Sequence, residues 1–212
     1  MKAKETAVIM IEFQNEFCKQ GGKLYDGVRS EMERQSTLAN AVKLQQQARQ
    51  KGCLIVMTPF VFDVEYARFW QPEGIVGIAA AAGAFRPGDW GTEIIEELKP
   101  TPQDAMVHGK ATLCGFNGSN LDMILKSAGI RNCILCGFLT NVCVEATART
   151  AYDRGYRIIV AKDACAAGSR EQQEYPEKYI FPLLGKALTV DEVLAQIEPA
   201  ASESLAPRKL GG

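Results

Sequence analysis

One cysteine in this sequence is placed where covalent chemistry is favourable. Cys143 stands in the segment GFLTNVCVE, where an apolar run passes into a helical pattern. A thiol in the first turn of a helix meets unpaired backbone N–H groups and the positive end of the helix dipole, and both stabilise the nucleophilic thiolate. The same N–H groups can bind the oxyanion of a tetrahedral intermediate. Cys143 is therefore a candidate nucleophile, and the alternative is a small buried residue that packs a helix against a sheet.

Two charged residues could assist such a nucleophile. Lys110 follows an apolar run in MVHGK, and an ammonium near a thiol lowers the thiol pKa by favouring the charged form. Glu12 follows IMI, and a carboxylate there could take the thiol proton and later deliver it to a leaving group. The alternatives are a solvated loop lysine and an N-cap or surface acid.

Other chemistry-bearing residues argue against several mechanisms. His108 is the only histidine, so a Cys-His or Ser-His-Asp mechanism would have to use it, yet its place in AMVH indicates packing against the sheet. One histidine cannot build the usual catalytic zinc site. The CxxC pair, Cys133 and Cys136, lies in an apolar run, where a strand points the two thiols to opposite faces. Neither GxGxxG nor a P-loop sequence occurs, so no phosphate-binding loop is expected.

The composition is typical of an ordinary soluble globule with one domain. The 212 residues are 47% apolar and 23% charged, and the formal net charge of −1 gives no support to nucleic-acid or membrane binding. The seven cysteines are odd in number and several lie in apolar runs, so no disulfide framework is expected. The early apolar run is too short for a transmembrane helix and no targeting signal is visible, which makes the cytoplasm the expected location.

Short apolar runs alternate with longer amphipathic stretches, which predicts an α/β fold with a doubly wound parallel sheet. The runs are apolar on both faces, as central parallel strands require. The expected strands are 7–11, 54–58, 105–108, 133–136, 158–161 and a sixth near 186–188, and the expected helices are 36–50, 92–98, 120–127 and 141–153. Ligands of such sheets bind beyond the carboxyl ends of the strands, where Glu12, Lys110 and Cys143 fall.

Two segments depart from the regular pattern. Residues 63–89 contain Gly- and Ala-rich patches and are expected to form a long pocket-forming loop with at most short helical turns. Residues 1–198 are expected to form the single domain. Residues 199–212, rich in small and polar side chains, are expected to be a flexible tail or an arm that contacts another subunit.

Three segments together resemble the isochorismatase-like cysteine hydrolase family. VIMIEFQNEF at 8–17 is similar to the family's apolar strand followed by an acid and then x-Q-N-D-F. KATLCGFNGSNL at 110–121 is similar to its lysine-containing strand end and turn, and GFLTNVCVEATARTAYDRGY at 137–156 is similar to its nucleophile segment almost throughout. The segments occur in the family's order and span most of the domain, so the sequence is identified as a member.

The resemblance implies a six-stranded parallel sheet of order 3-2-1-4-5-6 with helices on both faces. It implies an acid–Lys–Cys triad, which falls on Glu12, Lys110 and Cys143. A cis peptide bond is expected between Leu139 and Thr140, and the N–H groups of Thr140 and Cys143 would then form an oxyanion hole. Four aromatic residues could line the substrate pocket, or could instead be packing residues: Phe17, Phe60, Phe69 and Trp70.

Two departures from the family pattern bear on activity. The family acid is normally aspartate, and Glu12 is longer by one bond of about 1.5 Å, comparable to a shift that costs about a hundredfold in rate. Zinc-using nicotinamidases of the family carry an Asp-x-His…His set after the second strand, whereas TPFVFDVEYARF at 58–69 has no histidine. No metal and no other cofactor is therefore expected.

The favoured function is cysteine-dependent hydrolysis of a C–N bond in a small amide or ureido substrate through a thioester intermediate. One alternative is vinyl-ether hydrolysis of the isochorismatase type, which needs only Glu12 as a general acid. Another is a catalytically weak member that binds a ligand or acts in assembly, which the change from aspartate to Glu12 suggests. The expected partners are a small-molecule substrate and further copies of the chain in a dimer or tetramer, with no nucleic acid and no membrane.

Overall fold

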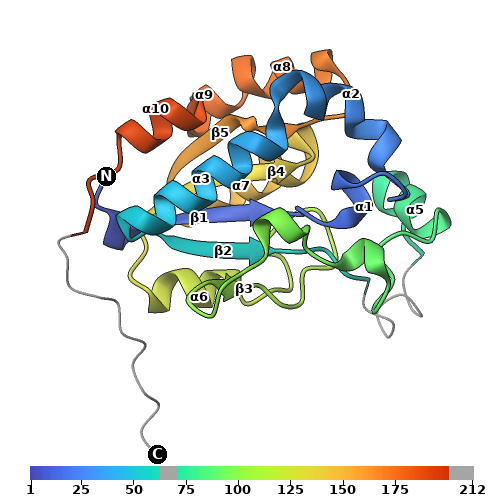
Figure 1. The fold of residues 1–212 in the computed structure, drawn as a ribbon, viewed down its shortest axis with the longest axis horizontal. Coiled ribbons are helices and arrows are strands. Elements are labelled where there is room, and N and C mark those ends of the chain that lie inside the picture. The colour runs from blue at the N-terminus through green and yellow to red at the C-terminus, as the bar shows by residue number, and fades with distance from the viewer. Residues whose placement is uncertain (63–70, 201–212) are drawn as a thin grey trace, which may run out of the picture.

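The computed structural model of the protein describes residues 1–62 and 71–200, and a six-stranded parallel sheet forms its centre (Figure 1). The strand order is β3-β2-β1-β4-β5-β6, which confirms the predicted fold class and order. The strands are β1 (Thr6–Ile11), β2 (Leu54–Thr58), β3 (Ala105–Met106), β4 (Asn132–Phe138), β5 (Arg157–Ala166) and β6 (Gly185–Leu188).

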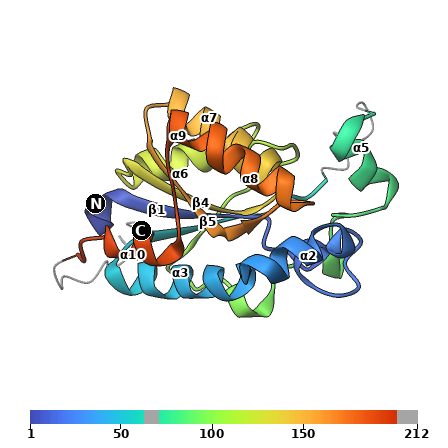
Figure 2. The same cartoon turned by 90° about the horizontal axis from the view of Figure 1, so that it is seen from above.

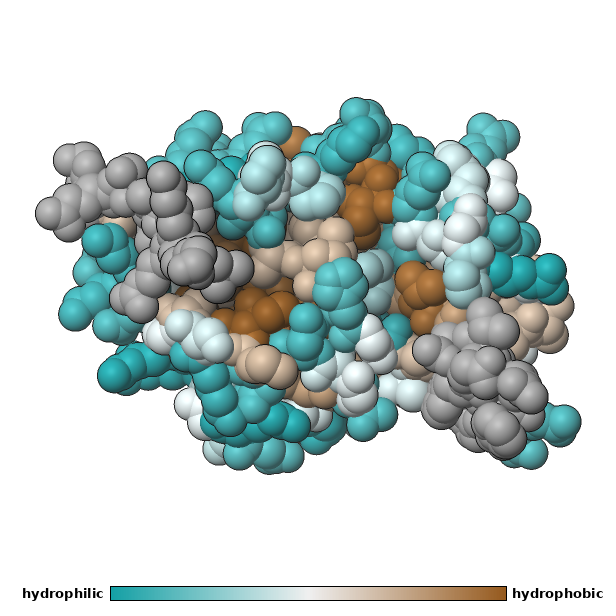
Figure 3. Space-filling view, turned by 90° about the horizontal axis from the view of Figure 1, so that it is seen from below, coloured by the Kyte–Doolittle hydropathy of each residue, from teal (hydrophilic) through white to brown (hydrophobic). Residues whose placement is uncertain are grey.

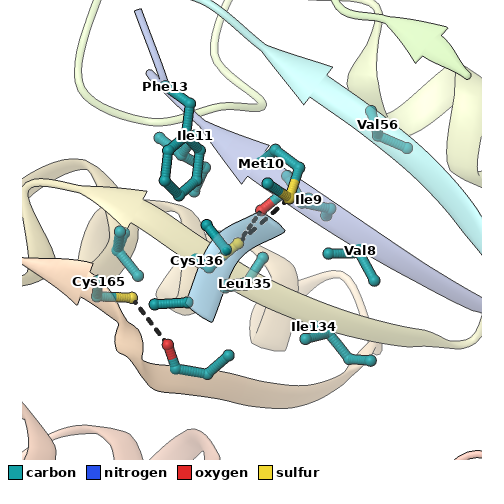
Figure 4. Close-up of a cluster of buried hydrophobic side chains, with 14 of the residues drawn as sticks. Val8, Ile9, Met10, Ile11, Phe13, Val56, Ile134, Leu135, Cys136 and Cys165 are labelled. Carbon is teal, nitrogen blue, oxygen red and sulfur yellow. Dashed lines mark hydrogen bonds between the residues drawn. The ribbon is translucent and has the colours of Figure 1, made fainter. Parts of the chain in front are cut away.

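The central strands β1 and β4 are buried along their whole length, because helices cover both faces of the sheet. Figure 4 shows how their side chains pack, with the Cys136 thiol 3.5 Å from the Met10 sulfur and 3.8 Å from the Ile9 carbonyl oxygen. Burial raises the pKa of the Cys133 thiol to about 12 and raises that of Cys136 as well. Both thiols of the CxxC pair are thus uncharged packing groups.

Two layers of helices enclose the sheet, as the edge-on view of Figure 2 shows. One layer contains α2 (Tyr25–Gln35), α3 (Thr37–Lys51) and α10 (Val190–Ala195). The other contains α6 (Leu121–Ser127), α7 (Glu145–Asp153), α8 (Arg170–Tyr179) and α9 (Phe181–Leu184). The short helix α1 (Asn15–Cys18) and α5 (Gly74–Ala81) lie beyond the carboxyl ends of the strands, where a ligand is expected in this class of sheet (Figure 1).

The predicted helix at 92–98 is wrong. Two separate 3₁₀ turns occur there, η2 (Trp90–Thr92) and η3 (Glu96–Leu98). The chain between them is extended because its backbone bonds to the segment that follows β1: the Ile95 N–H donates to the Phe13 carbonyl at 3.1 Å, and the Asn15 N–H donates to the Glu93 carbonyl at 2.9 Å. A tertiary contact therefore overrides the local helical pattern.

The segment predicted as a pocket loop contains a two-turn helix within its described part. Helix α5 spans eight residues and starts directly after Glu73. At Gly77 an added Cβ would lie 2.4 Å from the Pro72 carbonyl oxygen, so this turn is close-packed on the preceding chain and needs glycine. The residues before it, 63–70, are outside the described part, as is the predicted tail from residue 201 on.

The surface at the β3 edge is mostly hydrophilic, with several separate hydrophobic areas (Figure 3). Among the described residues, no helix combines the length and the apolar character that a membrane crossing needs.

Candidate active site

Glu12 is the residue at which the chain leaves β1. Its N–H donates to the Thr58 carbonyl of β2 at 3.1 Å, and its φ of +58° lies in the left-handed region that residues other than glycine rarely adopt. The side chain is buried, at 2% exposure, and its carboxylate pairs with the Lys110 ammonium. A rare backbone conformation at a buried charged residue is typical of functional sites.

Lys110 reaches the same place from the loop after β3. Gly109 permits the turn, since its φ is +87° and an added Cβ would lie 2.6 Å from the Gly118 carbonyl oxygen. The fully buried ammonium contacts the Glu12 carboxylate, lies 2.8 Å from the Thr112 carbonyl oxygen and sits 4.8 Å from the centre of the Phe60 ring. The charge therefore has three partners within the protein.

Cys143 lies in a π-helical turn, η4 (Thr140–Val144), between β4 and α7. Its pKa is raised well above the ordinary value, first by burial and next by the negative charge of Glu12, to which the thiol also hydrogen-bonds. Lys110 and a backbone hydrogen bond from Leu139 act in the opposite direction but do not outweigh these causes. The raised pKa favours the protonated thiol, whereas the helix position favours the thiolate.

The cis peptide bond is at Phe138–Leu139, one residue before its predicted place at Leu139–Thr140. Strand β4 remains paired with β5 through Phe138, whose ring is fully buried between Phe13 and Phe17, so the chain turns out of the sheet only after it.

The side chain of Thr140 points toward α8. Its buried hydroxyl is 2.5 Å from the Gln173 amide oxygen of α8, to which it donates a hydrogen bond. Leu139 lines the pocket beside Cys143, whereas Thr140 is not among the described lining residues. The Leu139 side chain thus lies at the pocket, while the Thr140 side chain joins the turn to α8.

Strands β1 and β4 approach each other closely next to these groups. Gly137 pairs with Ile11 and has a φ of +125°, and an added Cβ would lie 1.9 Å from the Ile11 carbonyl oxygen. Only glycine fits, and its presence brings the acid-bearing and cysteine-bearing chains together. We call the resulting group of Glu12, Lys110 and Cys143 the acid–lysine–thiol cluster.

A small pocket of about 350 Å³, including its open mouth, lies over the acid–lysine–thiol cluster. Three phenylalanines form one side, with ring centroids 5.0 Å apart for Phe60 and Phe85 and 5.6 Å apart for Phe17 and Phe85. We call these three rings the aromatic wall. Phe17 and Phe60 were predicted to line the pocket and do so, while Phe69 and Trp70 lie outside the described residues. The remaining lining residues are Glu12, Leu24, Ile75, Val76, Ala79, Leu113, Leu139, Val142 and Cys143.

Gln14 and Glu16, two and four residues after Glu12, hold the aromatic wall in place. The Gln14 amide exchanges two hydrogen bonds of 2.8 Å with the backbone of Phe60. The buried Glu16 carboxylate accepts hydrogen bonds from the N–H groups of Lys23 at 2.7 Å and Phe85 at 3.0 Å. In the sequence both residues stand within the family motif, and the signal for their role is the run of polar residues that follows a buried strand.

In the described part of the chain, no group of three or more His, Cys, Asp or Glu side chains could hold a metal ion. His108 is exposed and lines a separate groove with Pro59, Phe62 and Pro87. Among the described residues, this groove shares no lining residue with the pocket over Cys143.

The fold and this site define a known class of α/β protein. The family model described as the isochorismatase domain matches residues 6–192, and the chain belongs to this family. The predicted family is thereby confirmed.

Individual relatives are similar over nearly the whole chain. The ureidoacrylate amidohydrolase of Variovorax paradoxus is 30% identical over 215 residues, a match that covers 95% of this chain and 85% of the relative. The crystal structure of a cysteine hydrolase from Pseudomonas syringae superposes with a TM-score of 0.79 at 25% identity, covering 92% of this chain and 93% of the other. That of N-carbamoylsarcosine amidase from Thermoplasma acidophilum gives 0.69 at 29% identity, covering 88% and 97%.

Proposed function

We propose that this protein is a hydrolase acting on the carbon–nitrogen bonds of linear amides, and that its substrate is a small amide or ureido compound. The two relatives with named activities, a ureidoacrylate amidohydrolase and an N-carbamoylsarcosine amidase, support this reaction class. The observation that carries the proposal is the meeting of a carboxylate, an ammonium and a thiol from three separate strand ends beside one pocket.

In the first half of the reaction, the Cys143 sulfur attacks the substrate carbonyl carbon while its proton passes to the Glu12 carboxylate. The electron pair of the C=O double bond moves to oxygen and gives a tetrahedral oxyanion. Glu12 then returns the proton to the nitrogen, the C–N bond breaks, and ammonia or an amine leaves a thioester on Cys143. The neutral resting thiol suits this sequence, because deprotonation occurs during attack rather than before it.

In the second half, a water molecule gives a proton to Glu12 and its oxygen attacks the thioester carbonyl. The C–S bond breaks as the carboxylic or carbamic acid leaves, and the sulfur takes its proton back from Glu12. The same carboxylate therefore serves as base and acid in each half-reaction.

Lys110 and the turn that begins after Leu139 stabilise negative charge in this scheme. The Lys110 ammonium, held against Glu12 and the Thr112 carbonyl, keeps the carboxylate in place and offsets negative charge on sulfur. The backbone N–H groups of the turn, at Leu139, Thr140 and Cys143, are the proposed oxyanion donors. Glu12 pairs with Lys110 and lines the same pocket as Cys143, which supports a role for the longer acid in the cluster.

The test is turnover of a panel of amides and ureido compounds by the wild type, Cys143→Ala and Glu12→Gln, with intact-mass detection of a Cys143 adduct. We expect the loss of Cys143 to lower kcat by about 10⁴-fold or more and to remove the adduct. Turnover retained in Cys143→Ala but lost in Glu12→Gln would instead indicate general-acid chemistry without a covalent intermediate, as in vinyl-ether hydrolysis. No turnover and no adduct would contradict the proposed function.

A further inference from the structure

The pocket over the acid–lysine–thiol cluster has an almost entirely apolar lining. Apart from Glu12 and Cys143, every described lining residue carries an apolar side chain, including the aromatic wall and three residues of α5, namely Ile75, Val76 and Ala79. Both polar residues are assigned to the reaction itself. The part of the substrate that does not react therefore meets only apolar side chains in the described part of the site.

Two cations near the pocket, Lys110 and Lys23, already have partners. The Lys110 ammonium is fully buried among the Glu12 carboxylate, the Thr112 carbonyl and the Phe60 ring. The Lys23 ammonium, next to the lining residue Leu24, donates to the Gly83 carbonyl and lies 3.8 Å from Asp89. Neither is free to pair with a carboxylate on a bound substrate.

An unpaired carboxylate is disfavoured against the described lining, because these side chains offer neither a free cation nor hydrogen-bond donors in place of its lost hydration. An alkyl group or aromatic ring gains from the same burial. The small volume admits a compact group, and the aromatic wall offers ring faces for it to pack on.

On the basis of the proposed function, we propose that the substrate is a small amide or urea whose second group is uncharged and apolar, a branched alkyl or aromatic group rather than a carboxylate. This class differs from the substrates in the names of the relatives above, since both acrylate and sarcosine contain a carboxylic acid.

The test uses pairs of compounds that differ only by replacing a carboxylate with an isopropyl group of similar shape. One pair is 4-methylpentanamide and succinamate, and a second is 3-methylbutylurea and 3-ureidopropionate. With the full-length chain, which retains residues 63–70, we expect kcat/KM to be about a hundredfold or more higher for the neutral member. An equal or higher kcat/KM for the carboxylate member in either pair overturns the inference.

A charge placed at the pocket mouth should change this preference. Ile75 lines the pocket and Ile78, on the same helix, does not, yet both side chains are exposed. We expect Ile75→Arg to raise kcat/KM for succinamate relative to 4-methylpentanamide by about tenfold, and the matched variant Ile78→Arg to leave the ratio unchanged. An equal response of the two variants would mean that the pocket wall does not set the selectivity.

Binding separates this inference from the proposed function. Calorimetric titration of the Cys143→Ala protein measures affinity for each compound without any turnover. Tighter binding of the neutral members together with no turnover by the wild type would retain this ligand class and reject the hydrolase. Turnover together with tighter binding of the carboxylate members would retain the hydrolase and reject the neutral ligand class.

Discussion

The acid–lysine–thiol cluster and the aromatic wall meet in one pocket but are held there by different contacts. Glu12 and Cys143 follow the two central strands, which are buried along their whole length, and the Gly137 contact fixes the approach of these strands. The rings of Phe60 and Phe85 lie on connecting segments that the side chains of Gln14 and Glu16 hold by their backbones. The reacting groups thus depend on the sheet, and the wall depends on a few side-chain hydrogen bonds. Changes in the two regions should therefore have different kinetic signatures.

The largest effect is expected from removing the buried cation. Lys110→Met leaves the Glu12 carboxylate buried without its partner, which should lower the unfolding free energy by about 3–5 kcal/mol. We expect kcat to fall by roughly a thousandfold, because the charge beside the reacting atoms is lost. Denaturant unfolding and steady-state kinetics provide both measurements. The control is Lys126→Met, which breaks an exposed pair with Asp122 and should cost less than about 1 kcal/mol without a change in kcat. Similar results for the two variants would contradict the cluster's assigned role.

The pH dependence of alkylation tests the state of the nucleophile. Burial and Glu12 raise the pKa of the Cys143 thiol, so its thiolate fraction should rise about tenfold per pH unit between pH 7 and 9. The iodoacetamide rate at Cys143 should then increase by about a hundredfold over this range, as site-resolved mass spectrometry can follow. A rate that reaches its plateau near pH 7 would show a resident thiolate and exclude the neutral resting state.

The raised pKa also makes the unfolding free energy depend on pH. A thiol whose pKa is higher in the folded than in the unfolded protein keeps its proton longer when folded, so the folded state binds more protons once the pH exceeds the unfolded value of about 8.5. Its contribution to stability is complete below that pH and declines above it. Cys133, Cys136 and Cys143 all act in this direction, so the unfolding free energy should fall between pH 8.5 and 10.

Shortening the acid by one methylene separates position from charge. Glu12→Asp keeps the carboxylate but withdraws it by about 1.5 Å from Lys110 and Cys143, and we expect kcat to fall by up to about a hundredfold with a KM within a few-fold of wild type. An unchanged kcat would show that the backbone adapts to the shorter residue, and the cluster would then be less rigid than the sheet contacts suggest.

The same truncation in the wall should act mainly on substrate binding. Glu16→Asp cannot reach the N–H groups of both Lys23 and Phe85, which leaves a buried donor unpaired at a cost of about 1–3 kcal/mol. We expect KM to rise about tenfold while kcat stays within about threefold, because Phe85 shifts and the reacting groups do not. A matching loss of kcat would show that wall and cluster are one unit and would remove the distinction between them.

The sequence could predict the cluster far better than the wall. Long apolar runs such as that of β1 identify central strands, and the geometry of parallel sheets then brings Glu12, Lys110 and Cys143 to one edge. The place of the cis bond was missed by one residue, because the end of β4 depends on the burial of Phe138 between two rings from elsewhere in the chain.

The wall was less predictable because tertiary contacts shape it. The segment around Glu93 is extended through bonds to the chain after β1, although its own pattern is helical. The partners of Glu16 lie 7 and 69 residues away along the chain, and no local spacing reveals such a contact. Only the aromatic character of Phe17 and Phe60 indicated in advance that they belong to the pocket.

The close approach at Gly137 has a consequence for the divergence of such enzymes. A methyl group there would act as a wedge between the strands that precede the acid and the nucleophile, whatever substrate is bound. Ile75 on α5 carries no such restriction, since its side chain is exposed and lines the pocket. New specificities can thus evolve on α5. The glycine at position 137 meanwhile preserves the arrangement of the reacting groups.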